Sequence, residues 1–390
     1  MAKVPGSRRL WLGALAAGLP LAFGGGALLA KRTNKVSLPD YAARDLRSRL
    51  IVVTGGTSGI GNATCIELVR SGACVVIGSR NAARGAATAE QLSAEAARVA
   101  QCEGSVIVLP LDVSSPQSTL AFVDAVDAID AERGRAGVDA VLLAAAEIPT
   151  KEGGKTADGV DTAFATNHLG AHMLVKALEP ALRRGGTRET GRRARLVIVG
   201  SRLEAHASPD LAELAASGGA RFIAVRDQGA AAAAAAASTS DGAATNKREK
   251  TPFDPMLHYA ATKRCNMALA LSAHCAWRDA RAPIELVTVT PGMVNTALWR
   301  HYAGWFRLLT SPVRAAFLRT PSEAAAGVVY ALVAAELPRS AAKDSTGAAD
   351  APLYLSDAVA IEQSEGGRDV AFAAALSAVC DDIALRTTGC

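Results

Sequence analysis

Residues 54–61 read Thr54-Gly55-Gly56-Thr57-Ser58-Gly59-Ile60-Gly61, and this stretch decides the fold. It follows a short apolar run and precedes a longer stretch with a helical pattern. Glycines allow the backbone to approach a pyrophosphate closely, and the N-terminus of the next helix offers free N–H groups to phosphate oxygens. A glycine-rich turn alone can be no more than a tight turn. Its position between a predicted strand and a predicted helix indicates dinucleotide binding.

Short apolar runs alternate with helical patterns along the rest of the chain. Continuous apolar strands separated by helices are typical of a parallel sheet that is covered on both faces. Crossovers between parallel strands are right-handed, so we expect an α/β fold with one Rossmann-type doubly wound sheet over residues 49–390. Its ligand crevice should lie at the carboxyl ends of the strands. The predicted strands are Leu50–Thr54, Cys74–Gly78, Ser105–Leu109, Ala140–Ala144, Arg195–Gly200 and Ile284–Thr290.

One stretch, at about residues 210–254, has neither a strand pattern nor a core pattern. It contains eight consecutive alanines, Ala230–Ala237, followed by small polar residues and then by mostly basic ones. Such low complexity predicts an insert that forms a solvated loop. A helix that binds a partner is the alternative.

The N-terminal segment predicts contact with a membrane. Leu10–Ala30 is a run of 21 uncharged residues, which is long enough to cross about 30 Å of hydrocarbon as a helix. We therefore expect residues 1–35 to form an N-terminal transmembrane helix that anchors the protein. A cleaved signal or transit peptide and a buried helix are the alternatives. Basic residues that continue beyond the run favour a main domain on the cytosolic side.

Composition excludes several classes of site. The net charge of +5 is small and diffuse and aromatic residues make up only 4%, so nucleic acid is not an expected partner. The seven cysteines are scattered and never form a CxxC pair. They indicate neither a disulfide framework nor a zinc site, and they suit a reducing compartment. No metal is expected.

The residues at the end of the second predicted strand indicate whether the cofactor is NAD or NADP. Arg80 stands at the tip of this strand, and no Asp or Glu occurs between Cys74 and Thr88. An acidic residue there would bind the ribose 2′-hydroxyl of NAD, whereas an Arg accommodates the 2′-phosphate of NADP. We therefore expect NADP (NADPH) and consider NAD less favoured; Arg80 as a plain surface charge is the alternative. Asp112, after the third strand, either accepts a hydrogen bond from the adenine amino group or caps the next helix.

A second group of residues predicts proton transfer. Tyr259 and Lys263 are four residues apart, which puts both on one face of a helix. The ammonium is expected to favour the phenolate and so to lower the pKa of the phenol, which is about 10 in water. Ser201 ends the fifth predicted strand, where its hydroxyl can hold a carbonyl or alcohol oxygen. Asn167 lies in a helical pattern, and a satisfied structural amide is the alternative for it.

The turn after the sixth strand completes the set of predicted site residues. It begins at Pro291 and includes Thr296, and such a turn can wrap the nicotinamide end of the cofactor. The predicted cofactor-binding residues are Gly55, Thr57, Ser58, Gly59, Ile60, Gly61, Arg80, Asp112, Tyr259, Lys263, Pro291 and Thr296.

These motifs, in this order, resemble the short-chain dehydrogenase/reductase family from about Arg49 to the C-terminus, apart from the insert. Further matches, at 155–159, 167–170, 294–301, 320–325 and 352–356, resemble its microsomal retinol dehydrogenase branch, whose members carry an N-terminal anchor and prefer NADP. The resemblance implies that Tyr259 is the catalytic acid/base and that Lys263 lowers its pKa and holds the nicotinamide ribose. It further implies that Ser201 orients the substrate oxygen and that Asn167 anchors a proton-relay water.

The sequence departs from the family in two places. The family usually has Asn-Asn-Ala-Gly after the fourth strand, where this chain reads Leu143-Ala144-Ala145-Ala146-Glu147. This loss of amides affects the expected cofactor affinity but removes no chemical group. The second departure is the insert, which separates Ser201 from Tyr259 by 58 residues. Loop closure becomes only slowly less favourable with length, so both ends can stay in place.

The sequence therefore predicts a membrane-anchored, NADP(H)-dependent oxidoreductase that transfers a hydride between nicotinamide and a lipophilic alcohol/carbonyl pair. We expect it in the endoplasmic reticulum membrane with its catalytic domain in the cytosol, and a homodimer is a possible assembly. The apolar segment Trp299–Leu318 is either core packing or a lid over the substrate. A catalytically weak or inactive dinucleotide-binding scaffold or sensor of the same fold is the main alternative. A single-pass interaction protein without redox activity is the more remote one.

Overall fold

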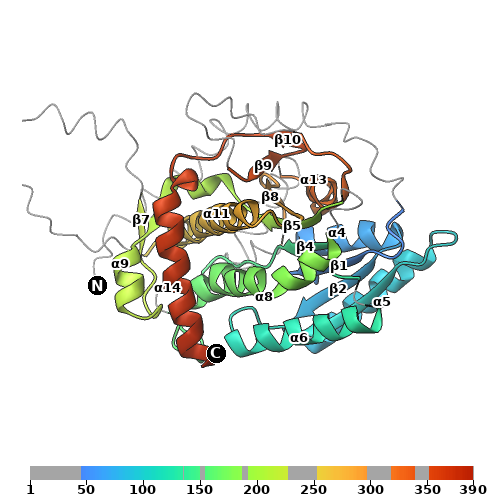
Figure 1. Cartoon of the computed structure of the whole chain (residues 1–390), viewed down its shortest axis with the longest axis horizontal. Helices are drawn as coiled ribbons and strands as arrows, with labels where there is room; N and C mark the ends of the chain where they lie inside the picture. The colour runs from blue at the N-terminus through green and yellow to red at the C-terminus, as the bar shows by residue number, and fades with distance from the viewer. Residues whose placement is uncertain are drawn as a thin grey trace, which may run out of the picture.

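The computed structural model describes most of the predicted domain. It shows a central eight-stranded sheet with helices on both faces (Figure 1). The expected membrane helix (residues 1–35) and nearly all of the apolar segment Trp299–Leu318 lie outside the described residues. The described residues are 45–134, 136–149, 154–186, 192–226, 253–296, 318–338 and 351–389.

The sheet has the strand order expected of a doubly wound fold. From edge to edge the order is β10-β9-β8-β5-β4-β1-β2-β3, and all neighbours are parallel except β9 and β10. The order reverses direction at β1, where β1 pairs with both β2 and β4, so the crevice opens beside β1. The six predicted strands are confirmed, with ends that agree to within one residue. The strands are β1 Leu50–Thr54, β2 Cys74–Ser79, β3 Ser105–Pro110, β4 Ala140–Leu143, β5 Ala194–Val199, β8 Ile284–Thr290, β9 Leu353–Ser356 and β10 Val359–Ala360.

Strand side chains alternate between two apolar layers, because successive residues of a strand point to opposite faces. On one face Ile51 and Val53 pack with α4 (Gly59–Arg70), α5 (Ala82–Ala97) and α13 (Pro321–Val333). On the other face Leu50 and Val52 pack with α6 (Pro116–Glu132), α8 (Gly170–Gly185) and α11 (Pro255–Asp279). Inner strands such as β1 and β2 are buried on both sides, which explains why they read as continuous apolar runs.

A third apolar cluster lies outside α11. The long helix α14 (Val370–Thr388, red in Figure 1) runs across α11 and α8 and buries Leu376 and Ile383 against them. The remaining elements of this layer are α7 (Thr162–Phe164), η1 (Ala165–Leu169), β6 (Ala207–Pro209), α9 (Leu211–Ala216), β7 (Ala224–Arg226) and, beside it, η2 (Arg202–His206) and η4 (Gly366–Arg368).

This layer corrects the predicted start of the insert. Residues 210–226 were expected to lack a core pattern, but α9 and β7 form there, and β7 pairs with β6. Leu214 and Phe222 are buried in the third cluster. Two apolar residues this far apart give too weak a period to be recognised in a sequence. The alanine run itself lies outside the described residues.

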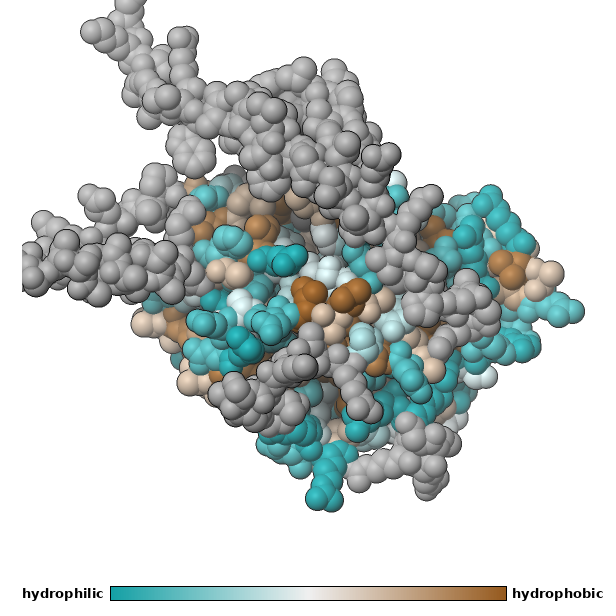
Figure 2. All heavy atoms as spheres, turned by 90° about the horizontal axis from the view of Figure 1, so that it is seen from above, coloured by the Kyte–Doolittle hydropathy of each residue, from teal (hydrophilic) through white to brown (hydrophobic). Residues whose placement is uncertain are grey.

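Within the part of the chain that the structure describes, no helix is both long enough and apolar enough to cross a membrane. Figure 2 shows the molecule from above the view of Figure 1, with hydrophobic and hydrophilic residues interspersed over the visible described surface. The described domain thus presents the mixed surface of an ordinary globular domain on this face.

Candidate active site

A cleft of about 370 Å³ lies at the carboxyl ends of the parallel strands. It is bounded by the turns that follow β1, β2, β3, β4, β5 and β8 and by one face of α11. Of the predicted site residues, Asn167 alone does not line it. The predicted residues on its wall are Gly55, Thr57, Ser58, Gly59, Ile60, Gly61, Arg80, Asp112, Ser201, Tyr259, Lys263, Pro291 and Thr296.

The turn between β1 and α4 forms a cradle that only glycine can build. Gly55 has φ +71°, and a Cβ there would lie 2.8 Å from the backbone nitrogen of Ala145. A Cβ on Gly61 would lie 2.4 Å from the carbonyl oxygen of Gly55. The side chain of Ser58, at the N-cap of α4, forms no capping hydrogen bond. The first N–H groups of α4 therefore face the cleft without a side-chain cap, as a pyrophosphate requires.

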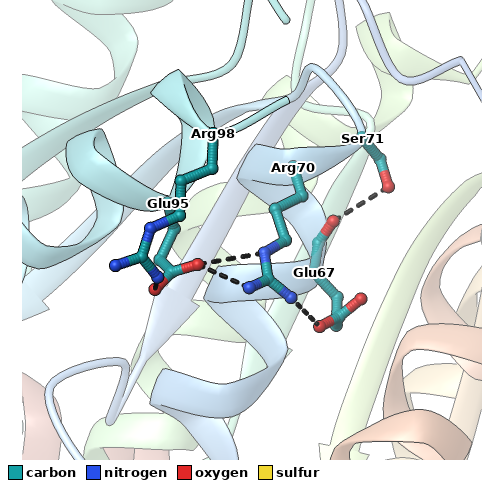
Figure 3. A network of polar contacts seen from close by, with 5 residues as sticks. All are labelled: Glu67, Arg70, Ser71, Glu95 and Arg98. Carbon is teal, nitrogen blue, oxygen red and sulfur yellow. Dashed lines mark hydrogen bonds and ion pairs between the residues drawn. The ribbon is translucent and has the colours of Figure 1, made fainter. Parts of the chain in front are cut away.

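The far end of α4 is held to α5 by surface ion pairs (Figure 3). Arg70 reaches Glu95 at 2.5 Å and Glu67 at 3.2 Å, and Arg98 reaches Glu95 at 2.6 Å. Ser71 Oγ donates to the carbonyl oxygen of Glu67 at 2.8 Å. Exposed pairs of this kind each contribute at most about 1 kcal/mol. They connect the end of α4 to α5 but do not stabilise the fold by much.

The end of the cleft at β2 is basic. Arg80 and Arg84 both line it, and the Arg80 side chain is 63% exposed. Arg80 Nη1 lies 4.0 Å from Asp112 Oδ1. That same Asp112 oxygen accepts hydrogen bonds from the backbone N–H and the hydroxyl of Ser114 at 3.0 and 2.7 Å. Asp112 therefore shapes the turn before α6, while Ser115 is the residue that caps the helix.

Tyr259 and Lys263 lie on the cleft side of α11, as their spacing predicts. Asp254 starts this helix by accepting from the backbone N–H groups of Met256 and Leu257. Lys263 Nζ donates to the carbonyl oxygen of Val199 at 2.9 Å and lies 5.5 Å from the centre of the Tyr259 ring. The helix is thereby fastened to the end of β5, and the amine and the phenol are held side by side.

Burial governs the proton affinity of this pair. Loss of hydration lowers the pKa of Lys263 to about 8 and raises the pKa of Tyr259 above its ordinary value. The expectation of a lowered phenol pKa is thus wrong for the structure as it stands. The physical reason is desolvation of a buried hydroxyl, which disfavours the charged phenolate.

Ser201 follows β5 and begins η2. Its Oγ accepts a hydrogen bond from the backbone N–H of Leu203 at 3.3 Å, so its own proton is free to be donated elsewhere. Ser201, at the N-cap of η2, and Tyr259, on α11, both line the cleft, and η2 packs against α11. The structure therefore brings the two hydroxyls and the Lys263 amine to one region of the wall.

Asn167 lies behind this wall in η1, a π-helical segment of five residues that interrupts the helix before α8. Its side-chain amide donates to the Glu147 carbonyl at 2.8 Å and to Thr262 Oγ1 at 3.1 Å, and it accepts from the Glu147 N–H at 2.7 Å. The side chain of Asn167 is thus held by three hydrogen bonds, and its role in a proton relay stays a prediction. It holds the loop after β4, where the family amides are missing, against the helix of Tyr259.

Several cleft residues were not singled out in the sequence. They include Glu147, Thr166 and Arg84, together with short stretches that follow β2, β4, β5 and β8. The available signal was their position directly after predicted strands, since the carboxyl ends of parallel strands meet at one edge. Thr166 carried no such signal, because a π-helical turn cannot be recognised from this sequence.

The Lys263 pKa gives a pH-dependent stability. In the folded protein the amine loses its proton near pH 8, but in the unfolded chain it does so near 10.5. The unfolded state binds more protons between these values, so this residue adds stability as pH rises, by about 1.4 kcal/mol per pH unit. We expect denaturant unfolding from pH 7 to 10.5 to show that the free energy of unfolding of the wild type rises relative to that of Lys263→Met. Parallel curves would contradict the assigned pKa.

Comparison with known proteins agrees with this geometry. A family model described as short chain dehydrogenase matches residues 49–240. Mouse polyprenol dehydrogenase (Mus musculus) is 30% identical over 295 residues, which cover 74% of this chain and 72% of that protein. Human retinol dehydrogenase 14 (Homo sapiens) is 26% identical over 297 residues, which cover 73% of this chain and 74% of that protein.

Solved structures agree in fold. The crystal structure of a putative uncharacterized protein from Mycobacterium paratuberculosis superposes with a TM-score of 0.57 at 21% identity, covering 88% of this chain and 96% of that one. The Pseudomonas aeruginosa RhlG/NADP active-site complex superposes with a TM-score of 0.50 at 20% identity, covering 74% of this chain and 91% of that one. The glycine cradle, the tyrosine–lysine helix and these relatives lead to one conclusion: the chain belongs to the short-chain dehydrogenase/reductase family.

Proposed function

We propose that this oxidoreductase is membrane-anchored, uses NADP(H), and interconverts a lipophilic alcohol and its carbonyl compound. The observation that carries the proposal is one cleft wall with a glycine cradle at one end and the hydroxyls of Ser201 and Tyr259 with the Lys263 amine at the other. The cradle suits a dinucleotide, and the second group suits proton exchange with an oxygen atom.

The proposed chemistry assigns a separate task to each side chain. A bound nicotinamide dinucleotide supplies or accepts the hydride at the substrate carbon. In the reducing direction the phenol of Tyr259 donates its proton to the substrate oxygen, and Ser201 donates a hydrogen bond to the same oxygen. The phenol of Tyr259 is protonated at neutral pH, as a proton donor must be, and burial raises its pKa further, which disfavours the phenolate. Lys263, with a pKa of about 8, is largely charged at pH 7 and stabilises the phenolate left behind.

The preference for NADP rests on charge at the end of β2. Two cations, Arg80 and Arg84, line this part of the cleft, and residues 74–87 contain no carboxylate that could accept from a ribose 2′-hydroxyl. A guanidinium can bind a 2′-phosphate through paired hydrogen bonds. The exposure of Arg80 leaves it able to turn toward that phosphate.

Exposed apolar side chains near the cleft support a lipophilic substrate. Leu203, two residues after Ser201, is 36% exposed, and Met293, which follows Pro291 and Gly292, is 55% exposed. Both are large hydrophobic groups that water solvates poorly. The names of the relatives, polyprenol dehydrogenase and retinol dehydrogenase 14, fit a long apolar alcohol or aldehyde. We propose a substrate of this class.

The membrane proposal rests on the sequence of residues 1–35. This segment is an uncharged run flanked by basic residues, as in a membrane anchor. An anchor in the endoplasmic reticulum with the domain in the cytosol would suit a domain that acts on lipophilic molecules. The anchor would hold the cleft close to the bilayer in which such substrates dissolve.

The proton donor can be tested with Tyr259→Phe. Loss of the phenolic proton should reduce kcat/KM for NADPH-dependent reduction of retinal or a polyprenal by about 10²- to 10⁴-fold, with NADPH binding retained in fluorescence titrations. Tyr330→Phe is the matched control, because Tyr330 lies on α13 and does not line the cleft, and its hydroxyl donates to the carbonyl of Glu336, which follows that helix. Wild-type protein that binds NADPH but turns over no member of an aldehyde panel would favour the scaffold alternative.

Cofactor choice can be tested with Arg80→Asp. The substitution removes the proposed phosphate partner and adds a possible 2′-hydroxyl acceptor, so the NADPH/NADH ratio of kcat/KM should fall by about 10- to 100-fold. Arg98→Asp, at the other end of α5 and 69% exposed, is the control and should leave the ratio unchanged. An unaltered ratio in Arg80→Asp would rule out the role assigned to this residue.

Membrane anchoring can be tested by alkaline carbonate extraction of membranes from cells that make the full chain. We expect the protein to remain in the membrane pellet. Leu19→Lys with Leu21→Lys should release it, because a charge at the middle of a membrane helix costs about 3 kcal/mol. Release of the wild-type chain, or an N-terminus that starts after residue 30, would show that the segment is not a permanent anchor.

A further inference from the structure

We infer that Glu204, Arg264 and Ser364 form a buried clamp that positions Ser201 against the helix of Tyr259. The inference rests on the proposed function, for which it names three positioning residues. None of the three lines the cleft. They would act through Ser201 alone, by fixing the turn that carries it.

The clamp is a closed triangle of polar contacts. Arg264 Nη1 donates to Ser364 Oγ at 2.8 Å and to Glu204 Oε2 at 3.4 Å, and Ser364 Oγ donates to Glu204 Oε2 at 2.7 Å. The side chains of Glu204 and Arg264 are only 2% and 8% exposed. A buried charge pair is held to a narrow geometry, because movement of either partner leaves a charge unpaired and out of water.

Each corner of the clamp comes from a different part of the chain. Glu204 is in η2, Arg264 is in α11, and Ser364 lies in the segment between β10 and η4. Sequence separations of 60 and 100 residues from Arg264 show that only the folded chain can bring them together. The clamp therefore connects three segments that are far apart in the sequence.

Two corners are next to catalytic positions. Arg264 directly follows Lys263 on α11. Glu204 is three residues after Ser201, and its backbone N–H donates to the Ser201 carbonyl at 3.1 Å, which closes the turn. A shift of Glu204 would therefore also move the Ser201 backbone, because the two residues belong to one hydrogen-bonded turn. The contact between Glu204 and Arg264 ties the serine turn to the tyrosine–lysine helix.

The C-terminal segment is shaped to accept the arginine. A Cβ on Gly366 would lie 2.0 Å from Arg264 Nη1, so only glycine leaves room for the guanidinium. The backbone N–H of Gly367 donates to Ser364 Oγ at 3.0 Å and sets that hydroxyl in place. Gly366→Ala therefore perturbs the clamp without changing any of its three side chains.

The test is a double-mutant cycle with Ser201. Glu204→Gln and Ser364→Ala should each lower kcat for carbonyl reduction by about 10- to 100-fold with little change in NADPH affinity. In a Ser201→Ala background the same substitutions should lower kcat further by less than about 3-fold, since residues that act through one group are not additive. The same fold-loss in both backgrounds would overturn the inference, because it would mean that the clamp only stabilises the fold.

A second measurement does not depend on turnover. Hydrogen exchange of peptides that cover residues 201–206 should quicken in Ser364→Ala, which removes one corner of the clamp, and in Gly366→Ala, which displaces the Arg264 guanidinium. Gly327→Ala is the matched control, because a Cβ there has no neighbour closer than 3.6 Å. Unchanged exchange in both variants would also overturn the inference. Full activity in Tyr259→Phe and Ser201→Ala would instead overturn the proposed function and leave the exchange result to decide the clamp.

Discussion

The contact between Gly61 and the carbonyl of Gly55 sets the geometry on which the site depends. A methyl group there would lie 2.4 Å from that oxygen, so the first turn of α4 can close on the end of β1 only without one. This close approach aims the start of α4 at the cleft. Gly55 in turn lies against the loop after β4, where its own Cβ would strike Ala145. The cradle, the loop and the end of the sheet are thus one packed unit.

Desolvation governs the other end of the cleft. Tyr259 and Lys263 are buried on α11, and in both cases loss of water disfavours the charged form. The pair therefore starts as a neutral phenol beside an amine that is easily deprotonated. Hydrogen bonding of Lys263 to Val199 keeps the amine in position throughout.

The fold was predictable from the sequence to a large degree. Strands buried on both faces leave unmistakable apolar runs, and glycine spacing marks the cradle, so β1 and the start of α4 were placed correctly. The direction of the Tyr259 pKa was not predictable, because burial depends on α11 lying under other elements. The hydrogen bonds of Asn167 to the Glu147 backbone were not predictable either, because they depend on a π-helical turn. Likewise the clamp joins residues up to 160 positions apart, and no local pattern indicates it.

The position of α14 has a consequence for how the protein matures. This helix covers α11 and contributes Asp381, whose carboxylate lies 2.7 Å from His172 of α8. The apolar outer face of α11 therefore stays open to water until residues 370–388 have been synthesised. The layer that covers α11 can therefore be completed only when the last helix of the chain has left the ribosome.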